Sequence, residues 1–487
     1  MTVDRFSAEG GYLIMGLSGR TELRGRLFGD RAFYRLVMRT AVPVMVQNGI
    51  TFFVNLLDNI MVGQIGTEPM SGVAIVNQLI FVFNLCIFGG LSGAGIFTAQ
   101  YYGRGDAEGI RHTFRYKLWT GLILCAVFMT VFLLMGEPLI RLYLTESESG
   151  GDIEATFRYG LSYLEIMLLG LPAFMLAQVY AGTLRECGET LLPMRAGIAA
   201  VSVNLLFNWL LIYGHLGFPQ MGVVGAAAAT VLSRFVELAI VAVWTHRHSA
   251  RQRWAQGVYR TLRVPYRLAG EFFAKGFPLL INEALWSVAQ ATLAQCYSVR
   301  GLHVVTASNI TNTITNLFNV VFMSMGTAIA IIVGQKLGTG DLEDAKKTDT
   351  RMIVFSILLS MGTALALFCT SPYFPRIYNT PDDVRRLATS LINVNALFMP
   401  MVAFMNSCYF TLRSGGKTWI TFLFDSVSVW CISVPIAYAL SRWTAIDVVW
   451  IVAMVHMGNM IKCAIGLYLV RKGDWLRNLV GVKVETV

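Results

Sequence analysis

The stretch AQYYGRGD at residues 99–106 returns as GQKLGTGD at residues 334–341. The Gln, both Gly and the final Asp are identical at matching places, and the two copies lie 235 residues apart. The same shift pairs Pro43 with Pro278. Self-similarity at a fixed spacing indicates that the chain contains two copies of one structural unit.

A second register supports the duplication. Further along the chain the shift is 228 residues, and TLRECGET at 183–190 matches TLRSGGKT at 411–418. A difference in the length of one loop accounts for both registers. Because two consistent registers are not expected by chance, we interpret the chain as one half-sequence written twice.

The composition predicts that most of the chain faces lipid. Hydrophobic residues make up 55% of the sequence and charged residues only 14%, and the mean hydropathy is +0.57. A soluble chain carries roughly a quarter charged residues. The net charge of +10 comes from basic residues in short loops, so we expect no nucleic-acid partner. The eight cysteines show no CxxC spacing, which argues against a structural metal site.

Apolar runs of about 20 residues predict membrane-spanning helices. Twelve occur, at approximately 34–62, 70–100, 116–136, 157–184, 192–213, 222–245, 272–297, 304–336, 351–370, 387–412, 418–440 and 447–470. We therefore expect an all-α integral membrane protein with twelve transmembrane helices in two six-helix lobes. Since each half holds an even number of spans, the lobes are expected to be related by a pseudo-two-fold axis along the membrane normal.

The loops set the expected orientation. The stretch 246–270 carries six arginines and no acid, whereas 145–155 on the other side is acidic. The positive-inside rule places the stretch 246–270 and both termini in the cytoplasm of a multi-pass cell-membrane protein. The expected parts are a cytoplasmic leader at 1–31, an N-lobe at 32–245, a basic cytoplasmic connector at 246–270, a C-lobe at 271–470 and a cytoplasmic tail at 471–487.

The order of several motifs resembles the multidrug and toxic compound extrusion (MATE) family of the flippase-like exporter superfamily. These motifs are Pro43 followed by LLDNIMVGQIG (56–66), GAGIFTAQYYGRGD (93–106), TLRECGETLLPM (183–194) and NLLFNWLLIYGHLGFPQMGVVGAAAAT (204–230). The resemblance covers roughly residues 32–470. It implies export of small molecules driven by inward flow of H⁺ or Na⁺, with no other cofactor.

The resemblance also implies a cation site in the N-lobe. The family's first-helix acid matches Asp58, and its polar fifth-helix pair matches Asn204 and Asn208. Some branches have Asp where this chain has Asn208, so one titratable group is missing here. An interfacial helix-end position is the alternative for Asp58, but an acid within a span is costly to insert and favours a coupling role.

Glu283 on the seventh span is the expected cation-binding acid of the C-lobe. One family branch places a sodium-binding acid there, together with a tenth-helix acid that this chain lacks. An ion pair with Lys275 or Lys462 is the alternative for Glu283. If the coupling ion is Na⁺, Asp58 and Glu283 are the expected metal ligands.

Amide side chains within the spans are expected to line a substrate cleft between the lobes, although hydrogen bonds between helices are their commoner use. The candidates are Asn77, Gln78, Gln178, Asn312 and Asn406. Arg234 and Glu237, three residues apart, are expected to form a structural ion pair. For Asp425, a gating pair and a cleft-lining role are both open.

The sequence predicts a monomeric secondary exporter in lipid that moves amphipathic or organic-cation molecules by alternating access. A lipid-linked oligosaccharide flippase of the same superfamily is the alternative, but it needs a cationic cleft and few Arg or Lys fall inside the spans. No catalytic residues are expected, since HExxH, GxSxG and Walker motifs do not occur.

Overall fold

The computed structural model describes residues 27–144, 152–378 and 380–481. Most of the expected leader, all but residues 27–31, therefore lies outside the described residues. The same holds for the acidic stretch 145–151 and for the end of the expected tail, from residue 482 on.

Each half of the chain forms six long helices, and the described ranges contain no strand. The first six are α2 (Arg31–Gly63), α3 (Thr67–Arg104), α4 (Ala107–Tyr143), α5 (Ile153–Glu186), α6 (Leu191–Tyr213) and α7 (Val223–Arg247). The next four are α8 (Tyr266–Ser298), α9 (Leu302–Thr339), α10 (Leu342–Thr370) and α11 (Asp382–Ser414). The eleventh starts as α12 (Thr418–Phe422) and ends as α13 (Val434–Trp443), and α14 (Val448–Lys472) is last.

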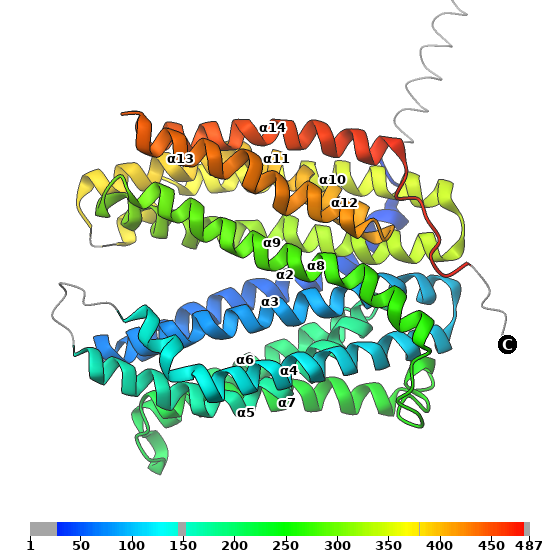
Figure 1. The fold of residues 1–487 in the computed structure, drawn as a ribbon, viewed down its shortest axis with the longest axis horizontal. Coiled ribbons are helices and arrows are strands. Elements are labelled where there is room, and N and C mark those ends of the chain that lie inside the picture. Colours follow the sequence, from blue (N-terminus) through cyan, green and yellow to red (C-terminus); the bar gives the residue numbers. More distant parts are fainter. Residues whose placement is uncertain (1–26, 145–151, 379, 482–487) are drawn as a thin grey trace, which may run out of the picture.

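The expected fold class is confirmed: this is an all-α integral membrane protein with twelve helices in two lobes. Figure 1 shows α2–α7 as one bundle and α9–α14 as the other. Ten of the twelve helices in the described ranges are long and apolar enough to span a membrane. The other two, α2 and α8, have the same length of 33 residues but carry charged and amide side chains along their course, among them Asn48, Asp58, Lys275 and Glu283.

These two more polar helices touch both bundles. Helix α2 packs on α6 of its own half and on α9 of the other, while α8 packs on α3 as well as on α12 and α13. Both contain a proline near the middle of the helix, Pro43 and Pro278. Because each proline removes one backbone hydrogen bond, each of these two helices has a weak point in its backbone.

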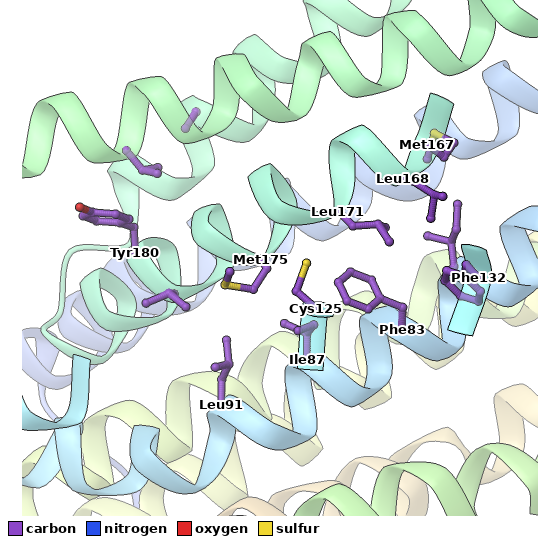
Figure 2. Packing of buried hydrophobic residues seen from close by; sticks show 14 of the residues in the cluster. Phe83, Ile87, Leu91, Cys125, Phe132, Met167, Leu168, Leu171, Met175 and Tyr180 are labelled. Carbon is purple, nitrogen blue, oxygen red and sulfur yellow. The ribbon is translucent and has the colours of Figure 1, made fainter. Parts of the chain in front are cut away.

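The first bundle has an extended apolar core between α3, α4 and α5. Figure 2 shows Phe83 and Ile87 of α3 pointing toward Leu171 and Met175 of α5, with Cys125 of α4 beside them. Polar and charged side chains that enter this region must therefore find partners among themselves.

The duplicated motif forms the closest approach of the two halves. A Cβ atom on Gly103 would lie 1.9 Å from the Gln335 carbonyl oxygen, and one on Gly338 would lie 2.0 Å from that of Gln100. Only glycine allows backbones to come this near. The reciprocal contact explains why the repeat keeps Gln and Gly together at the ends of α3 and α9.

The connector lies at this same end, which we call the connector end. It packs on the first bundle: Arg115 Nε donates to the Val258 carbonyl at 2.9 Å, and Trp119 Nε1 donates to that of Leu262 at 3.0 Å. Trp254 of the connector is itself buried and packs against Phe114 of α4. The connector is therefore an ordered cap on α4 as well as a link between halves.

Candidate functional site

The first polar site joins α2, α6 and α7. Asn208 Nδ2 donates to Asp58 Oδ1 at 2.6 Å and also lies 3.2 Å from Asn204 Oδ1. Asn204 Nδ2 in turn donates to Thr230 Oγ1 at 3.2 Å. The two asparagines lie one turn apart on α6, so both amides point to the same side of that helix. The three residues expected at an N-lobe cation site are thus brought together.

This site is rich in oxygen atoms. Asn204 and Asn208 are buried, Asp58 is half-buried, and the Asn208 Oδ1 atom has no hydrogen-bond partner. Carboxylate, amide and hydroxyl oxygens are the donors that hard cations prefer. A free carbonyl oxygen beside a carboxylate is therefore suited to a proton, a hydrated cation or a directly bound Na⁺.

A small cavity of about 30 Å³ adjoins the site, lined in part by Asn84, Thr230 and Arg234. A water molecule needs roughly 10–15 Å³, so the cavity has room for water next to Thr230. Arg234 Nη1 lies 3.3 Å from Glu237 Oε2, which confirms the expected ion pair. Arg234 also acts electrostatically on Asp58, so the first bundle holds a cation near this acid.

Glu283 lies at the boundary between the two bundles. Tyr409 on α11 donates to Glu283 Oε1 at 3.4 Å, and a Cβ on Gly89 of α3 would be 3.4 Å from Glu283 Cγ. The 235-residue shift of the repeat pairs Glu283 with Asn48 and Gly89 with Ser324. Asn48 Nδ2 donates to Ser324 Oγ at 3.3 Å, so the equivalent contact between α2 and α9 is a hydrogen bond. Glu283 therefore faces the first bundle as well as its own.

A second cation accompanies Glu283. Arg413 is buried, interacts electrostatically with Glu283, and stacks on Phe88 of α3 with its guanidinium carbon 5.4 Å from the ring centre. Its Nη1 atom has no hydrogen-bond partner. A cation in this position compensates the charge of the Glu283 carboxylate.

Lys462 forms an ion pair with Asp425, not with Glu283, the partner considered for it from the sequence. Its Nζ atom lies 2.7 Å from Asp425 Oδ1, and Asn282 Nδ2 donates to Asp425 Oδ2 at 3.1 Å. Asp425 sits in the first of two π-helical turns, Leu423–Val427, an irregularity that often marks functional positions in helices. Asp425 is therefore ion-paired with Lys462, and the two roles expected for it, gating pair and cleft lining, stay predictions.

The five amides expected to line a cleft do not form one cluster. Asn77, Gln78 and Asn312 are exposed, and within the described ranges no hydrogen bond joins any two of the five. Asn406 instead donates to the Phe322 carbonyl at 3.0 Å, and Gln178 accepts from Arg185 at 3.4 Å. Asn406 therefore joins α11 to α9, which is the commoner use of intramembrane amides, whereas Gln178 is bonded within α5.

Asp349 is a buried acid that the sequence did not single out. It is fully buried on α10, accepts from Thr411 Oγ1 at 2.6 Å, and its Oδ2 atom has no partner. The preceding stretch LEDAKK is so charged that the apolar span was expected to begin only at residue 351. The helix in fact begins at Leu342, and its helical period turns Asp349 inward.

Comparison with known proteins agrees with this architecture. The MatE family model matches residues 43–210 and 278–439. The probable multidrug resistance protein NorM of Thermotoga maritima is 23% identical over 451 residues, covering 91% of this chain and 93% of that protein. The multidrug resistance protein PmpM of Pseudomonas aeruginosa is 26% identical over 419 residues, covering 84% of each.

A solved structure shares the fold. The crystal structure of the Vibrio cholerae MATE transporter VcmN superposes with a TM-score of 0.81 at 16% identity, covering 91% of this chain and 98% of that one. The family model itself spans more than half of the sequence, in two blocks that coincide with the two halves of the duplication. This chain is a multi-pass membrane transporter, not an enzyme, and it belongs to the MATE family.

Proposed function

We propose that the chain exports amphipathic or organic-cation small molecules across the cell membrane in exchange for inward-moving H⁺ or Na⁺. The observation that carries this proposal is the hydrogen-bonded group of Asp58, Asn204 and Asn208. An acid within a transmembrane segment is costly, roughly 2.5–3.5 kcal/mol at the helix centre, and is therefore kept for a purpose. Reversible binding of a cation to Asp58 is such a purpose.

The two bundles suit alternating access. Their glycine contacts close the connector end, and we propose that this end faces the cytoplasm, with both termini, as the basic connector supports. Under this proposal the lobes comprise residues 32–245 and 271–470, and the protein works as a monomer in lipid. The exposed amides Asn77, Gln78 and Asn312 lie toward the opposite ends of α3 and α9, where substrate would leave.

Glu283 links cation binding to movement of the lobes. Because it lies against Gly89 of the first bundle and near Arg413 of the second, a change in its net charge alters the packing at the boundary between bundles. Binding of H⁺ or Na⁺ to Glu283 releases Arg413 from its role as counter-ion. Under this proposal Asp58 and Glu283 are separate coupling positions, one in each half.

The available energy is sufficient for useful export. One elementary charge crossing 100 mV yields about 2.3 kcal/mol. At about 1.4 kcal/mol per tenfold ratio, this supports a concentration gradient of roughly 50-fold for a neutral substrate.

Ethidium efflux from everted membrane vesicles tests the proposal. A pH gradient and a Na⁺ gradient are imposed separately on vesicles that carry wild type, Asp58→Asn or Glu283→Gln. The matched control is Glu137→Gln, which removes an exposed carboxylate from α4. We expect one of the two gradients to drive efflux, Asp58→Asn to abolish it, and Glu137→Gln to leave it intact. Efflux that ignores both gradients in every variant would refute coupling.

The flippase alternative makes a different demand on the same bundles. It needs free cations facing a pyrophosphate, whereas Arg234 and Lys462 are each paired with a carboxylate and Arg413 lies near Glu283. A lipid-linked oligosaccharide translocated by vesicles that fail to move ethidium would nevertheless favour it.

A further inference from the structure

The nine residues that follow α14 form an ordered segment, residues 473–481, which we call the C-terminal strap. It begins with Gly473 in a left-handed conformation, φ 77°, which turns the chain sharply away from the helix. Two of its apolar side chains, Trp475 and Val480, are buried, with exposed fractions of 1% and 3%. An exposed tail does not bury a tryptophan, so the strap is a packed part of the fold.

The strap is fixed first to the second bundle. Trp475 Nε1 donates to the Val470 carbonyl at 3.0 Å, and the side chain joins an apolar cluster formed mainly by α9, α10 and α11, with Val37 and Ala41 of α2. A Cβ on Gly415, just after α11, would lie 1.9 Å from the Trp475 carbonyl oxygen. The strap can therefore lie this close to the end of α11 only because glycine occupies position 415.

The strap then binds the first bundle through the repeated motif. The Leu479 amide donates to Gln100 Oε1 at 2.7 Å, and Gln100 Nε2 lies 3.2 Å from the Arg477 carbonyl and 3.1 Å from that of Ser414. Arg104 donates to the Val480 carbonyl. Gln100 is fully buried, and all three of its side-chain hydrogen bonds are made to residues from the second half of the chain.

The position of the strap gives these contacts a consequence. They lie at the connector end, where Gly103 meets Gln335 and Gly338 meets Gln100, and Figure 1 shows the strap passing from α14 to the ends of the other bundle. Val480 belongs to an apolar cluster made mostly by the first bundle, whereas Trp475 belongs to one made mostly by α9, α10 and α11 of the second. Separating the bundles at this end must pull one of these anchors out.

We propose that the C-terminal strap is a latch that holds the connector end closed and must release Gln100 before that end opens. The proposal rests on alternating access between the two bundles, but not on the coupling acids or on the identity of the ion. It assigns Gln100 and Trp475 to control of the conformational equilibrium and gives neither a role in binding substrate.

The expected size of the effect follows from the hydrogen bonds. Loss of one buried hydrogen bond changes an equilibrium by about 2- to 12-fold. Gln100→Leu removes three hydrogen bonds while keeping apolar volume, so we expect the population with an open connector end to rise by about 10-fold or more. Trp475→Ala removes the other anchor and is expected to act in the same direction.

The experiment measures the distance between the bundles directly. Spin labels on unnatural amino acids replace Glu108 at the start of α4 and Lys346 near the start of α10, both exposed at the connector end. Double electron–electron resonance is recorded for the full-length protein in lipid nanodiscs, with Gln100→Leu, Trp475→Ala and Arg477→Ala. The last variant is the matched control, because the Arg477 side chain is exposed and only its backbone carbonyl takes part in the strap.

Longer distances in Gln100→Leu and Trp475→Ala, with Arg477→Ala unchanged, support the latch. Distance distributions identical to wild type in both anchor variants would overturn it, and so would an equal change in the Arg477→Ala control. The readout requires no transport. A failed latch and a failed coupling proposal are therefore distinguished, since only the second would show in the vesicle efflux of Asp58→Asn.

Discussion

Replacing Lys462 by methionine leaves the Asp425 carboxylate without the cation that neutralises it. The Lys462 side chain is only 8% exposed, and its Nζ atom lies 2.7 Å from Asp425 Oδ1. Methionine keeps most of the length and the apolar stem but removes the charge. Asp425 then keeps one protein donor, Asn282, at 3.1 Å.

The magnitude follows from the burial of the two partners. Breaking a buried ion pair by removing one partner costs about 3–5 kcal/mol in the free energy of unfolding. Because the Asp425 side chain is 20% exposed and retains Asn282, we expect the low end, about 3 kcal/mol. Adding Asp425→Asn removes the stranded charge, so the double variant should recover about 2 kcal/mol of that loss.

Denaturant unfolding in detergent micelles, followed by tryptophan fluorescence, measures these differences. The matched control is Lys336→Met, because Lys336 lies 2.5 Å from Asp344 in a pair whose side chains are 38% and 41% exposed. An exposed pair of this kind contributes about 0–1 kcal/mol. If Lys462→Met costs no more than the control, or if the double variant is less stable than Lys462→Met, the assignment of a buried pair is refuted.

Three other perturbations have defined outcomes. Gly103→Ala places a methyl group 1.9 Å from the Gln335 carbonyl, so we expect looser packing of the connector end and faster amide exchange there in mass spectrometry. Arg115→Ala removes the donor to the Val258 carbonyl, and limited proteolysis should then cut within the connector at lower protease concentration than in wild type. Asp349→Asn keeps an oxygen that accepts from the Thr411 hydroxyl, so the free energy of unfolding, measured by thermal denaturation, should change by no more than about 1 kcal/mol. Asp349→Leu removes that acceptor and should lower the free energy of unfolding by about 1–3 kcal/mol more.

The fold could be predicted because a duplicated apolar pattern constrains it strongly. Helices must span the membrane with all backbone groups bonded internally, so the number and order of the apolar runs almost fix the architecture. Close glycine contacts such as Gly103 with Gln335 then explain the motif that revealed the repeat. The helix starts were predicted less well, because charged first turns such as that of α10 resemble loops in sequence.

The partners of polar groups could be predicted only where spacing along one helix decides them. Arg234 and Glu237 face each other because they are one turn apart, and Asn204 and Asn208 share a side of α6 for the same reason. The link from Lys462 to Asp425 joins two helices and depends on the path of the π-helical turns between α12 and α13. Nothing in the spacing of residues along the chain specifies such a contact.

The two halves have kept one cation in common but not their acids. The repeat places Lys462 at the position of Arg234, whereas Asp425 stands where the first half has Gly197, a residue whose Cβ would touch Gln47. Arg234 therefore pairs within its own helix, and Lys462 pairs across helices.

Asp58 and Glu283, the two acids proposed for coupling, follow the same pattern. Leu293, which is buried, occupies the position of Asp58, and Asn48 occupies that of Glu283. Each acid thus has an uncharged mate, and the two acids lie at different positions along their helices. The two halves thus share a fold but differ in where their acid lies, one within the first bundle and one at the boundary. We therefore expect Asp58 and Glu283 to differ in effect, with Asp58→Asn acting on coupling and Glu283→Gln acting also on the movement of the bundles.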